Sequence, residues 1–296
     1  ATLAGQPSHR GFADGVGTGA DFSGTSKALF DQPEGIVTDG KIAYVADSLN
    51  GAIRKIDLAT SQVSTVAGPG LGWGDGPAAS AAFYKNAGLA WVPSQNVIYI
   101  AEPGNADIRK LDLTTNQVST VAGDHNHAGF QDGPVATALF NNPFGILASP
   151  DGTKLYIADT GNNLIRMIDL TAGTVSTIAG HGLGSADGVG TAASFAEPNG
   201  LAWDATGQNI YISDFENAAI RELNLATGQV TTIVGLAHKC GGDDGPAASA
   251  SLCDPAFLST DGRSLFWGDS ELGLLRALDL RTMQVDTLAG SAPTPK

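Results

Sequence analysis

The sequence predicts an all-β fold, a β-propeller of four-stranded antiparallel blades, from a long internal repeat, strand-like patterning and regularly placed turns. One segment recurs as Ile53–Leu58, Ile108–Leu113, Ile165–Leu170, Ile220–Leu225 and Leu275–Leu280, at spacings of 55, 57, 55 and 55 residues. No segment between the copies has a helical period of useful length. Units of this size cannot bury a core alone, so they must pack against their neighbours.

The second unit shows the expected order of strands and turns. Strands are predicted over 88–92, 97–102, 108–113 and 118–123, with turns or loops over 93–95, 103–107 and 114–116. The first two strands are apolar, whereas the third alternates apolar and charged residues. Four antiparallel strands joined by tight turns and repeated along the chain are typical of a propeller blade.

The outermost predicted strand helps to count the blades. Its pattern, Val-x-Thr-x-Ala-Gly or a close variant, begins at Val63, Val118, Val175, Val230 and Val285. A further fragment of this pattern opens the chain at residues 1–5. We therefore expect one propeller domain over residues 1–296, with five blades and an extra N-terminal edge segment. The repeats span approximately 6–68, 69–123, 124–180, 181–235 and 236–290, and six blades is the alternative.

A motif between the second and third strands carries a family resemblance. Asp47, Asn50, Ile53 and Arg54 form an Asp-x-x-Asn-x-x-Ile-Arg pattern, which recurs from Asp159 and from Asp214. Glu102 replaces the Asp in the second unit, and Leu272 replaces the Asn in the fifth. Over nearly its whole length the chain resembles the NHL-repeat β-propellers. The resemblance implies a platform for protein, RNA or a ligand, or in some relatives an enzyme.

The net charge and the apolar content of the chain restrict the classes of partner that it is expected to bind. The chain of 296 residues has a net charge of −14, which repels phosphate backbones and disfavours nucleic acid as a partner. No apolar run approaches the roughly 20 residues that a membrane-spanning helix needs. We expect a monomer or a module of a larger protein.

The two cysteines, Cys240 and Cys253, lie in one linker. We expect a disulfide between them, which indicates an oxidising compartment and a secreted or extracellular protein. Two free thiols in a reducing cell are the alternative, so a cytoplasmic location stays open.

The linkers between blades share the core Asp-Gly-Pro-x-Ala-x-Ala-x-Phe, as in residues 75–83 and 132–140. The Asp is expected to cap a turn and the Phe to pack between blades. The repeated acids and the Arg of the motif are expected to form hydrogen bonds or ion pairs within each blade. The linkers and the loops between the second and third strands lie on one face, here called the top, where binding is expected because long loops on a rigid scaffold carry function.

Residues that break the repeat at this face are the candidate ligand-binding residues. They are Glu34, Phe144, Asn199, Phe215 and Glu216 near the channel mouth, with Trp73 and Phe130 at the rim. We expect them to contact a protein, peptide or glycan without catalysis and without a cofactor.

Two other functions remain open. One is a metal-assisted lyase or hydrolase of the lactonase kind, in which Glu34, Glu102 and Asp159 hold a divalent cation, with Asn199 beside it. The other is a structural repeat module of a larger protein. No nucleophile elbow, phosphate loop or zinc cluster is present in the sequence.

Overall fold

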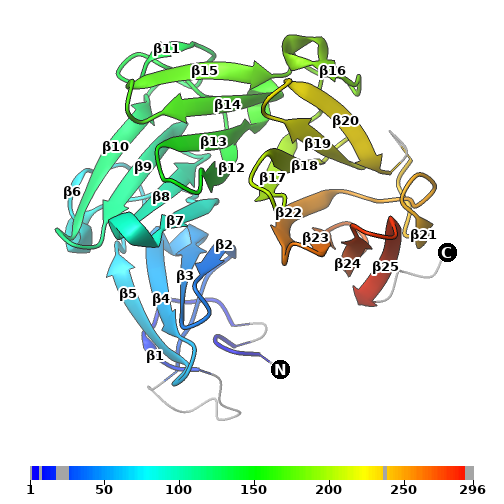
Figure 1. The fold of residues 1–296 in the computed structure, drawn as a ribbon. Coiled ribbons are helices and arrows are strands. Elements are labelled where there is room, and N and C mark those ends of the chain that lie inside the picture. Colours follow the sequence, from blue (N-terminus) through cyan, green and yellow to red (C-terminus); the bar gives the residue numbers. More distant parts are fainter. Residues whose placement is uncertain (1, 7–8, 18–26, 236–238, 291–296) are drawn as a thin grey trace. The chain divides into compact units, whose positions relative to one another are not determined.

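The computed structural model describes residues 2–6, 9–17, 27–235 and 239–290. The chain divides into two compact units, one containing residues 1–131 and 135–143 and the other containing residues 132–134 and 144–296. The first unit holds two blades and the second holds three (Figure 1). The fold class is therefore an all-β propeller of five blades, as predicted.

The blades of the first unit follow one order of strands. The first blade contains β1 (Gly15–Val16), β2 (Pro33–Thr38), β3 (Ile42–Asp47), β4 (Ala52–Asp57) and β5 (Gln62–Ala67). The second contains β6 (Gly76–Pro77), β7 (Leu89–Val92), β8 (Val97–Glu102), β9 (Asp107–Asp112) and β10 (Gln117–Gly123).

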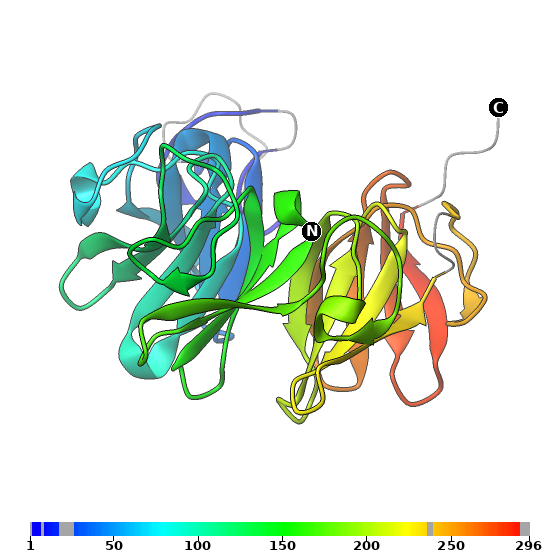
Figure 2. The same cartoon turned by 90° about the horizontal axis from the view of Figure 1, so that it is seen from above.

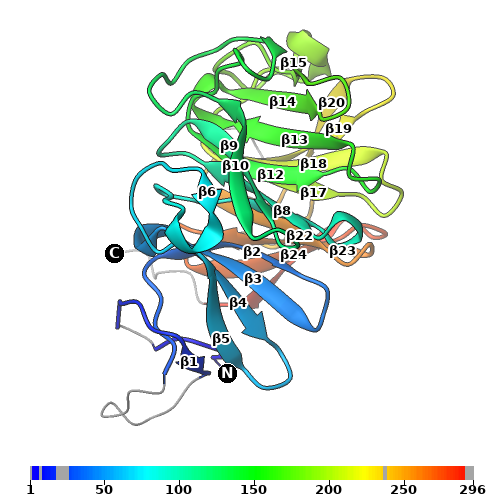
Figure 3. The ribbon, with the colours of Figure 1, turned by 90° about the vertical axis from the view of Figure 1, so that its left-hand side faces the viewer.

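The blades of the second unit repeat this order. The third contains β11 (Gly133–Pro134), β12 (Pro143–Ala148), β13 (Lys154–Asp159), β14 (Leu164–Asp169) and β15 (Thr174–Ala179). The fourth contains β16 (Gly188–Val189), β17 (Pro198–Trp203), β18 (Asn209–Asp214), β19 (Ala219–Asn224) and β20 (Gln229–Val234). The fifth contains β21 (Gly245–Pro246), β22 (Pro255–Thr260), β23 (Ser264–Asp269), β24 (Leu274–Asp279) and β25 (Gln284–Ala289). Figure 3 shows β12 to β15 of the third blade side by side.

Helical structure in the described part of the chain is limited to short 3₁₀ turns in loops. These are η1 (Ser48–Asn50), η2 (Ala78–Ser80), η3 (Pro93–Gln95), η4 (Thr160–Asn162) and η5 (Gly190–Ala192). No helix of the described residues is long and apolar enough to cross a membrane.

Each blade has five strands, so the prediction of four was wrong. The sheet order of the first blade is β1-β5-β4-β3-β2, and the other four blades follow it. The additional strand is two residues long and comes from the Asp-Gly turn of the linker, where Gly15 pairs with Val63 on β5. The Asp14 carboxylate accepts the backbone N–H of Thr65 on β5 at 3.1 Å, which fixes the turn beside the sheet edge.

The described part of the extra N-terminal segment, residues 2–5, forms no strand. Ala1 lies outside the described residues. Ala4 instead packs against the apolar cluster of the first blade, which includes Val45 and Val63.

The core lies between the faces of adjacent blades within each unit. In the first unit, Ile53 of β4 packs with Phe83 of the next linker and with Ile98 of β8, and all three are fully buried. In the second unit, the sheets of the fourth and fifth blades lie face to face (Figure 2), and Ile220 packs with Leu265. The predicted role of the linker Phe between blades is confirmed at Phe83.

Candidate binding surface

A buried arginine holds each linker onto its blade. In the first blade, Arg54 is fully buried and forms ion pairs with Asp47 at 2.7 Å and with Asp14 of the linker at 2.8 Å. Its guanidinium also donates to the carbonyl oxygens of Leu29 and Ala13. The linker is thereby attached at two points to strand β4.

The Asn of the repeat motif adds a second attachment. The Asn50 side chain donates to the Gly11 carbonyl of the linker at 2.8 Å and to the Asp47 carboxylate at 2.9 Å. In the fourth blade, Asn217 donates in the same way to Gly184 and Asp214. We call this set of Arg, two acids and Asn the linker clamp. The prediction that these repeated residues form a scaffold is confirmed.

The Arg and the two acids of the clamp recur in all five blades. Its ion pairs are Arg54 with Asp14 and Asp47, Arg109 with Asp75 and Glu102, Arg166 with Asp132 and Asp159, Arg221 with Asp187 and Asp214, and Arg276 with Asp244 and Asp269. Aromatic rings lie over the guanidinium in several blades. The Trp73 ring centroid, for example, is 5.7 Å from the Arg109 guanidinium carbon.

The clamp of the fifth blade departs from the other four. Leu272 occupies the position of the clamp Asn, and the Arg276–Asp269 pair lengthens to 3.5 Å. The predicted disulfide, Cys240–Cys253, is present here and joins the two ends of the linker. Burial raises the pKa of Asp269 to about 6, although the Cys253 N–H and Arg276 oppose this.

The second blade contains an additional buried acid. Asp107 lies directly opposite Glu102 in the β8–β9 register, where the other blades have Ala or Leu. Its carboxyl is fully buried beside that of Glu102. Burial and the adjacent Glu102 raise the pKa of Asp107 to about 8. Burial and the negative charge of Glu102 therefore both favour the protonated form of Asp107.

In the first unit, the structure brings two linkers together at the predicted rim. Trp73 is 41% exposed, and its ring stacks on His125 of the next linker with centroids 4.0 Å apart. Phe130, in the same linker as His125, is 57% exposed. Leu71 is 61% exposed and was missed by the sequence reasoning. We call Leu71, Trp73, His125 and Phe130 the linker patch.

Glu34 and Glu102 of the first unit have different surroundings. Glu34 is half-buried at the start of β2, and burial raises its pKa. Glu102 is fully buried and paired with Arg109 at 2.6 Å. The Glu102 carboxylate is thus a part of the linker clamp of the second blade.

In the second unit, three of the predicted residues are half-buried and one is exposed. Phe144 is half-buried and packs on Phe257, with ring centroids 5.4 Å apart. Asn199 is half-buried, and its Oδ1 atom has no hydrogen-bond partner in the described part of the chain. Phe215 is half-buried and Glu216 is exposed.

Asp159 is fully buried and paired with Arg166 at 2.6 Å. Two of the three acids of the metal alternative, Glu102 and Asp159, are thus neutralised by arginines. The described residues contain no group of three or more His, Cys, Asp or Glu side chains that could hold a metal ion.

Phe257 was also missed, although the repeat carries a signal for it. It stands where the other blades have Gly35, Gly88, Gly145 and Gly200. A Cβ on Gly200 would lie 2.8 Å from the Phe257 Cα, which explains the glycine, because the next strand approaches closely. Phe257 adopts a φ of 43°, an unusual conformation for a bulky residue, and its side chain is 39% exposed.

Comparisons with curated proteins show related sequences. Protein SUPPRESSOR OF QUENCHING 1, chloroplastic, from Arabidopsis thaliana is 30% identical over 291 residues, which cover 91% of this chain and 27% of that protein. NHL repeat-containing protein 2 from Homo sapiens is 28% identical over 301 residues, which cover 89% of this chain and 41% of that protein. The chain thus spans well under half the length of these relatives. No protein-family model matches it.

Solved structures show the same fold at low identity. A chain in the crystal structure of a nidogen/laminin complex has a TM-score of 0.64 and 16% identity, with 90% of this chain and 82% of that chain covered. An auxiliary nutrient binding protein from Bacteroides thetaiotaomicron has a TM-score of 0.53 and 17% identity, with 96% and 74% covered.

Proposed function

Since the chain belongs to the NHL-repeat β-propeller family, we propose that it is a non-catalytic binding module that presents the linker patch to a protein partner. The proposal rests on one observation: the same linkers are firmly attached to their blades and carry exposed apolar side chains. The clamp holds each linker by buried ion pairs, while Leu71 and Phe130 remain 61% and 57% exposed.

Rigid display favours binding because little conformational entropy is lost when the partner arrives. Large aromatic side chains are the residues that most often dominate protein interfaces, and the patch contains Trp73 and Phe130. The stack of Trp73 on His125 joins the two linkers that carry Leu71 and Phe130 within the first unit. The fold also occurs in the nidogen/laminin complex, a protein–protein assembly, which agrees with this partner class.

The aromatic pair of the second unit is the proposed second contact. Phe144, Asn199, Phe215 and Glu216 remain candidate ligand-binding residues there, and Phe257 joins them. Glu34 is the corresponding candidate in the first unit.

The experiment compares variants that keep the fold. Partners are captured from an extract of the source organism, purified and titrated against the wild type and against Leu71→Ala/Phe130→Ala. We expect the double variant to bind at least about 30-fold more weakly, because hot-spot residues contribute about 2 kcal/mol or more. Leu183→Ala is the matched control, since Leu183 occupies the position of Leu71 in the fourth repeat and is 77% exposed.

Equal binding by the double variant would refute the role of the linker patch. A parallel titration with Phe144→Ala/Phe215→Ala tests the second contact, and its thermal midpoint should stay close to that of the wild type. A large loss of stability in that variant would show that these rings belong to the core. Selective binding to a glycan array, with no protein partner, would contradict the proposed partner class.

A further inference from the structure

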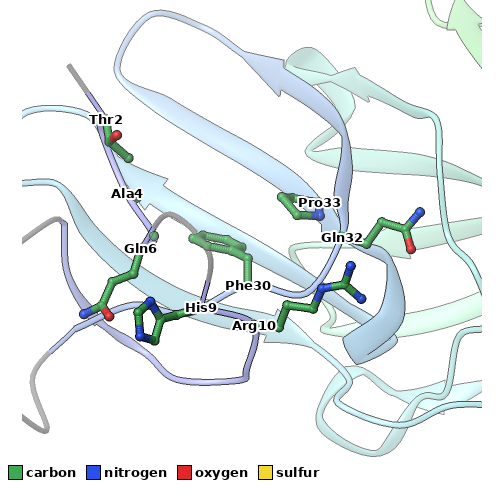
Figure 4. Close-up of a pocket in the computed structure, with 9 residues that line it drawn as sticks. Thr2, Ala4, Gln6, His9, Arg10, Phe30, Gln32 and Pro33 are labelled. Atoms are coloured by element: carbon green, nitrogen blue, oxygen red, sulfur yellow. The ribbon is translucent and has the colours of Figure 1, made fainter. Parts of the chain in front are cut away.

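A hollow of about 380 Å³ lies in the first unit, at some distance in sequence from the linker patch (Figure 4). Its volume is within the range of pockets that bind small molecules. The lining residues come from the N-terminal segment, from both ends of the first linker and from the start of β2. They are Thr2, Ala4, Gly5, Gln6, His9, Arg10, Phe30, Gln32 and Pro33.

One wall of the hollow is apolar. Phe30 occupies the position of the linker Phe, which is fully buried at Phe83 and Phe195, but Phe30 is only partly buried. The Arg54 guanidinium lies over its ring, with the guanidinium carbon 5.0 Å from the ring centroid. Figure 4 shows the ring at the centre of the hollow, with Pro33 beside it. A flat apolar group could therefore pack on Phe30 and Pro33.

Arg10 supplies a positive charge to the lining of the hollow. It occupies a linker position where the next three repeats have Leu71, Ala128 and Leu183, so it departs from an apolar pattern. Its side chain is 77% exposed, and among the described residues its ionic partner is Asp31, reached through Nε at 3.7 Å. Both terminal nitrogens of the guanidinium can therefore receive a second anion, in the paired geometry that suits a carboxylate.

The local charge differs from that of the whole chain. The net charge is −14, yet none of the nine lining residues is acidic. His9, Gln6, Gln32 and Thr2 add polar groups to the lining of the hollow. A lining that contains a cation and no carboxylate, with Asp31 as the carboxylate paired with Arg10, favours an anion over a cation.

We propose that this hollow binds a small organic anion, a carboxylate attached to a flat apolar body. The carboxylate pairs with the Arg10 guanidinium, and the apolar body lies on Phe30 and Pro33. This site is separate from the linker patch, so its test does not depend on the proposed protein partner.

The probe for the test is 2-naphthoate, titrated by isothermal calorimetry at low salt. We expect one site on the wild type, and Arg10→Gln should weaken binding at least about 10-fold, because a charge-assisted paired contact is lost. Arg281→Gln is the matched control, since it removes the same charge from an exposed turn of the second unit, and it should leave binding unchanged. The neutral analogue 2-naphthamide should bind at least about 10-fold more weakly than the carboxylate.

A titration with inorganic phosphate, an anion without an apolar body, tests the role of the apolar wall separately from that of the Arg10 charge. Phosphate binding much weaker than that of 2-naphthoate supports a role for the apolar wall. Phosphate binding as tight as that of 2-naphthoate would overturn that role. The proposal also fails if 2-naphthoate shows no saturable binding, or if Arg281→Gln weakens it as much as Arg10→Gln does.

Discussion

The fourth and fifth repeats of the second unit hold equivalent linkers by different means. In the fourth, Asn217 donates to the Gly184 carbonyl at 2.7 Å, and Arg221 pairs with Asp214 at 2.6 Å. In the fifth, Leu272 cannot donate to the equivalent Gly241 carbonyl. The disulfide instead anchors Cys240, the residue directly before Gly241.

The first repeat places a third kind of link at the same pair of positions. Arg10 and Asp31 correspond to Cys240 and Cys253 in the repeat, and they form an ion pair at 3.7 Å. The first repeat also keeps the hydrogen bond from Asn50 to Gly11, so only the fifth repeat combines a link at these positions with the loss of the Asn. Where the Asn is lost and the arginine pair lengthens, a covalent link replaces the hydrogen bond.

The largest expected effect comes from removing the clamp arginine in either repeat. Arg221→Met or Arg276→Met leaves two carboxylates without their cation, and each should cost about 3–5 kcal/mol of unfolding free energy, measured by urea titration. The two variants should differ in proteolysis. The fourth linker should be cleaved readily in Arg221→Met, whereas the disulfide should protect the fifth linker in Arg276→Met. Equal cleavage of both linkers would contradict the comparison.

Opening the disulfide is the next largest change. Cys240→Ser/Cys253→Ser should lower the unfolding free energy by about 3 kcal/mol, because the bond closes a loop of 13 residues in sequence. Dithiothreitol should lower the thermal midpoint of the wild type and leave that of the double variant unchanged. An identical response of both proteins to the reductant would show that the effect does not come from this bond.

Exchanging the Asn and Leu of the two repeats should have a smaller effect. Asn217→Leu leaves the Gly184 carbonyl without its donor and should cost about 1–3 kcal/mol. Leu272→Asn, made in the background without the disulfide, should restore about 1 kcal/mol by donating to the Gly241 carbonyl. Unfolding by urea measures both, and a further loss of stability in Leu272→Asn would refute the proposed equivalence.

The smallest expected effect is a change in how the unfolding free energy depends on pH. Burial raises the pKa of Asp269 from its ordinary value of 3.8 to about 6, so the folded state binds this proton more tightly than the unfolded state. Its contribution to stability therefore falls as the pH rises from about 4 to about 6. Leu272→Asn adds a donor to the carboxylate, which should lower its pKa and make this fall smaller, by about 1.4 kcal/mol for each pKa unit. Stability curves at several pH values test this, and an unchanged slope would contradict it.

Much of the fold could be predicted because each repeat contains local patterns of apolar strand residues and turn residues. The strand predicted over 97–102 matches β8, and the one over 108–113 differs from β9 by one residue. The fifth strand of each blade was missed because two residues carry no periodicity. Asp14 and its equivalents hold the turn against the sheet edge, a contact between segments far apart in the sequence.

The candidate surface could be predicted only in part. The pairing of Cys240 with Cys253 followed from their sharing one linker, but its relation to Leu272 depends on the contact between Asn217 and Gly184 in the neighbouring repeat. The exposure of Leu71 and the packing of Phe144 on Phe257 depend on how linkers and strands meet in space. The sequence marks Phe257 as a departure from the repeated glycine, but it does not show that the Phe257 ring meets that of Phe144.

Hydrogen exchange of the fourth and fifth linkers, with and without reductant, tests the central claim most directly. We expect reduction to speed exchange at residues 241–252, to leave residues 184–195 unchanged, and to have little effect at residues 241–252 once Leu272→Asn is introduced. Unchanged exchange at residues 241–252 after complete reduction would contradict the claim that the disulfide replaces the missing hydrogen bond.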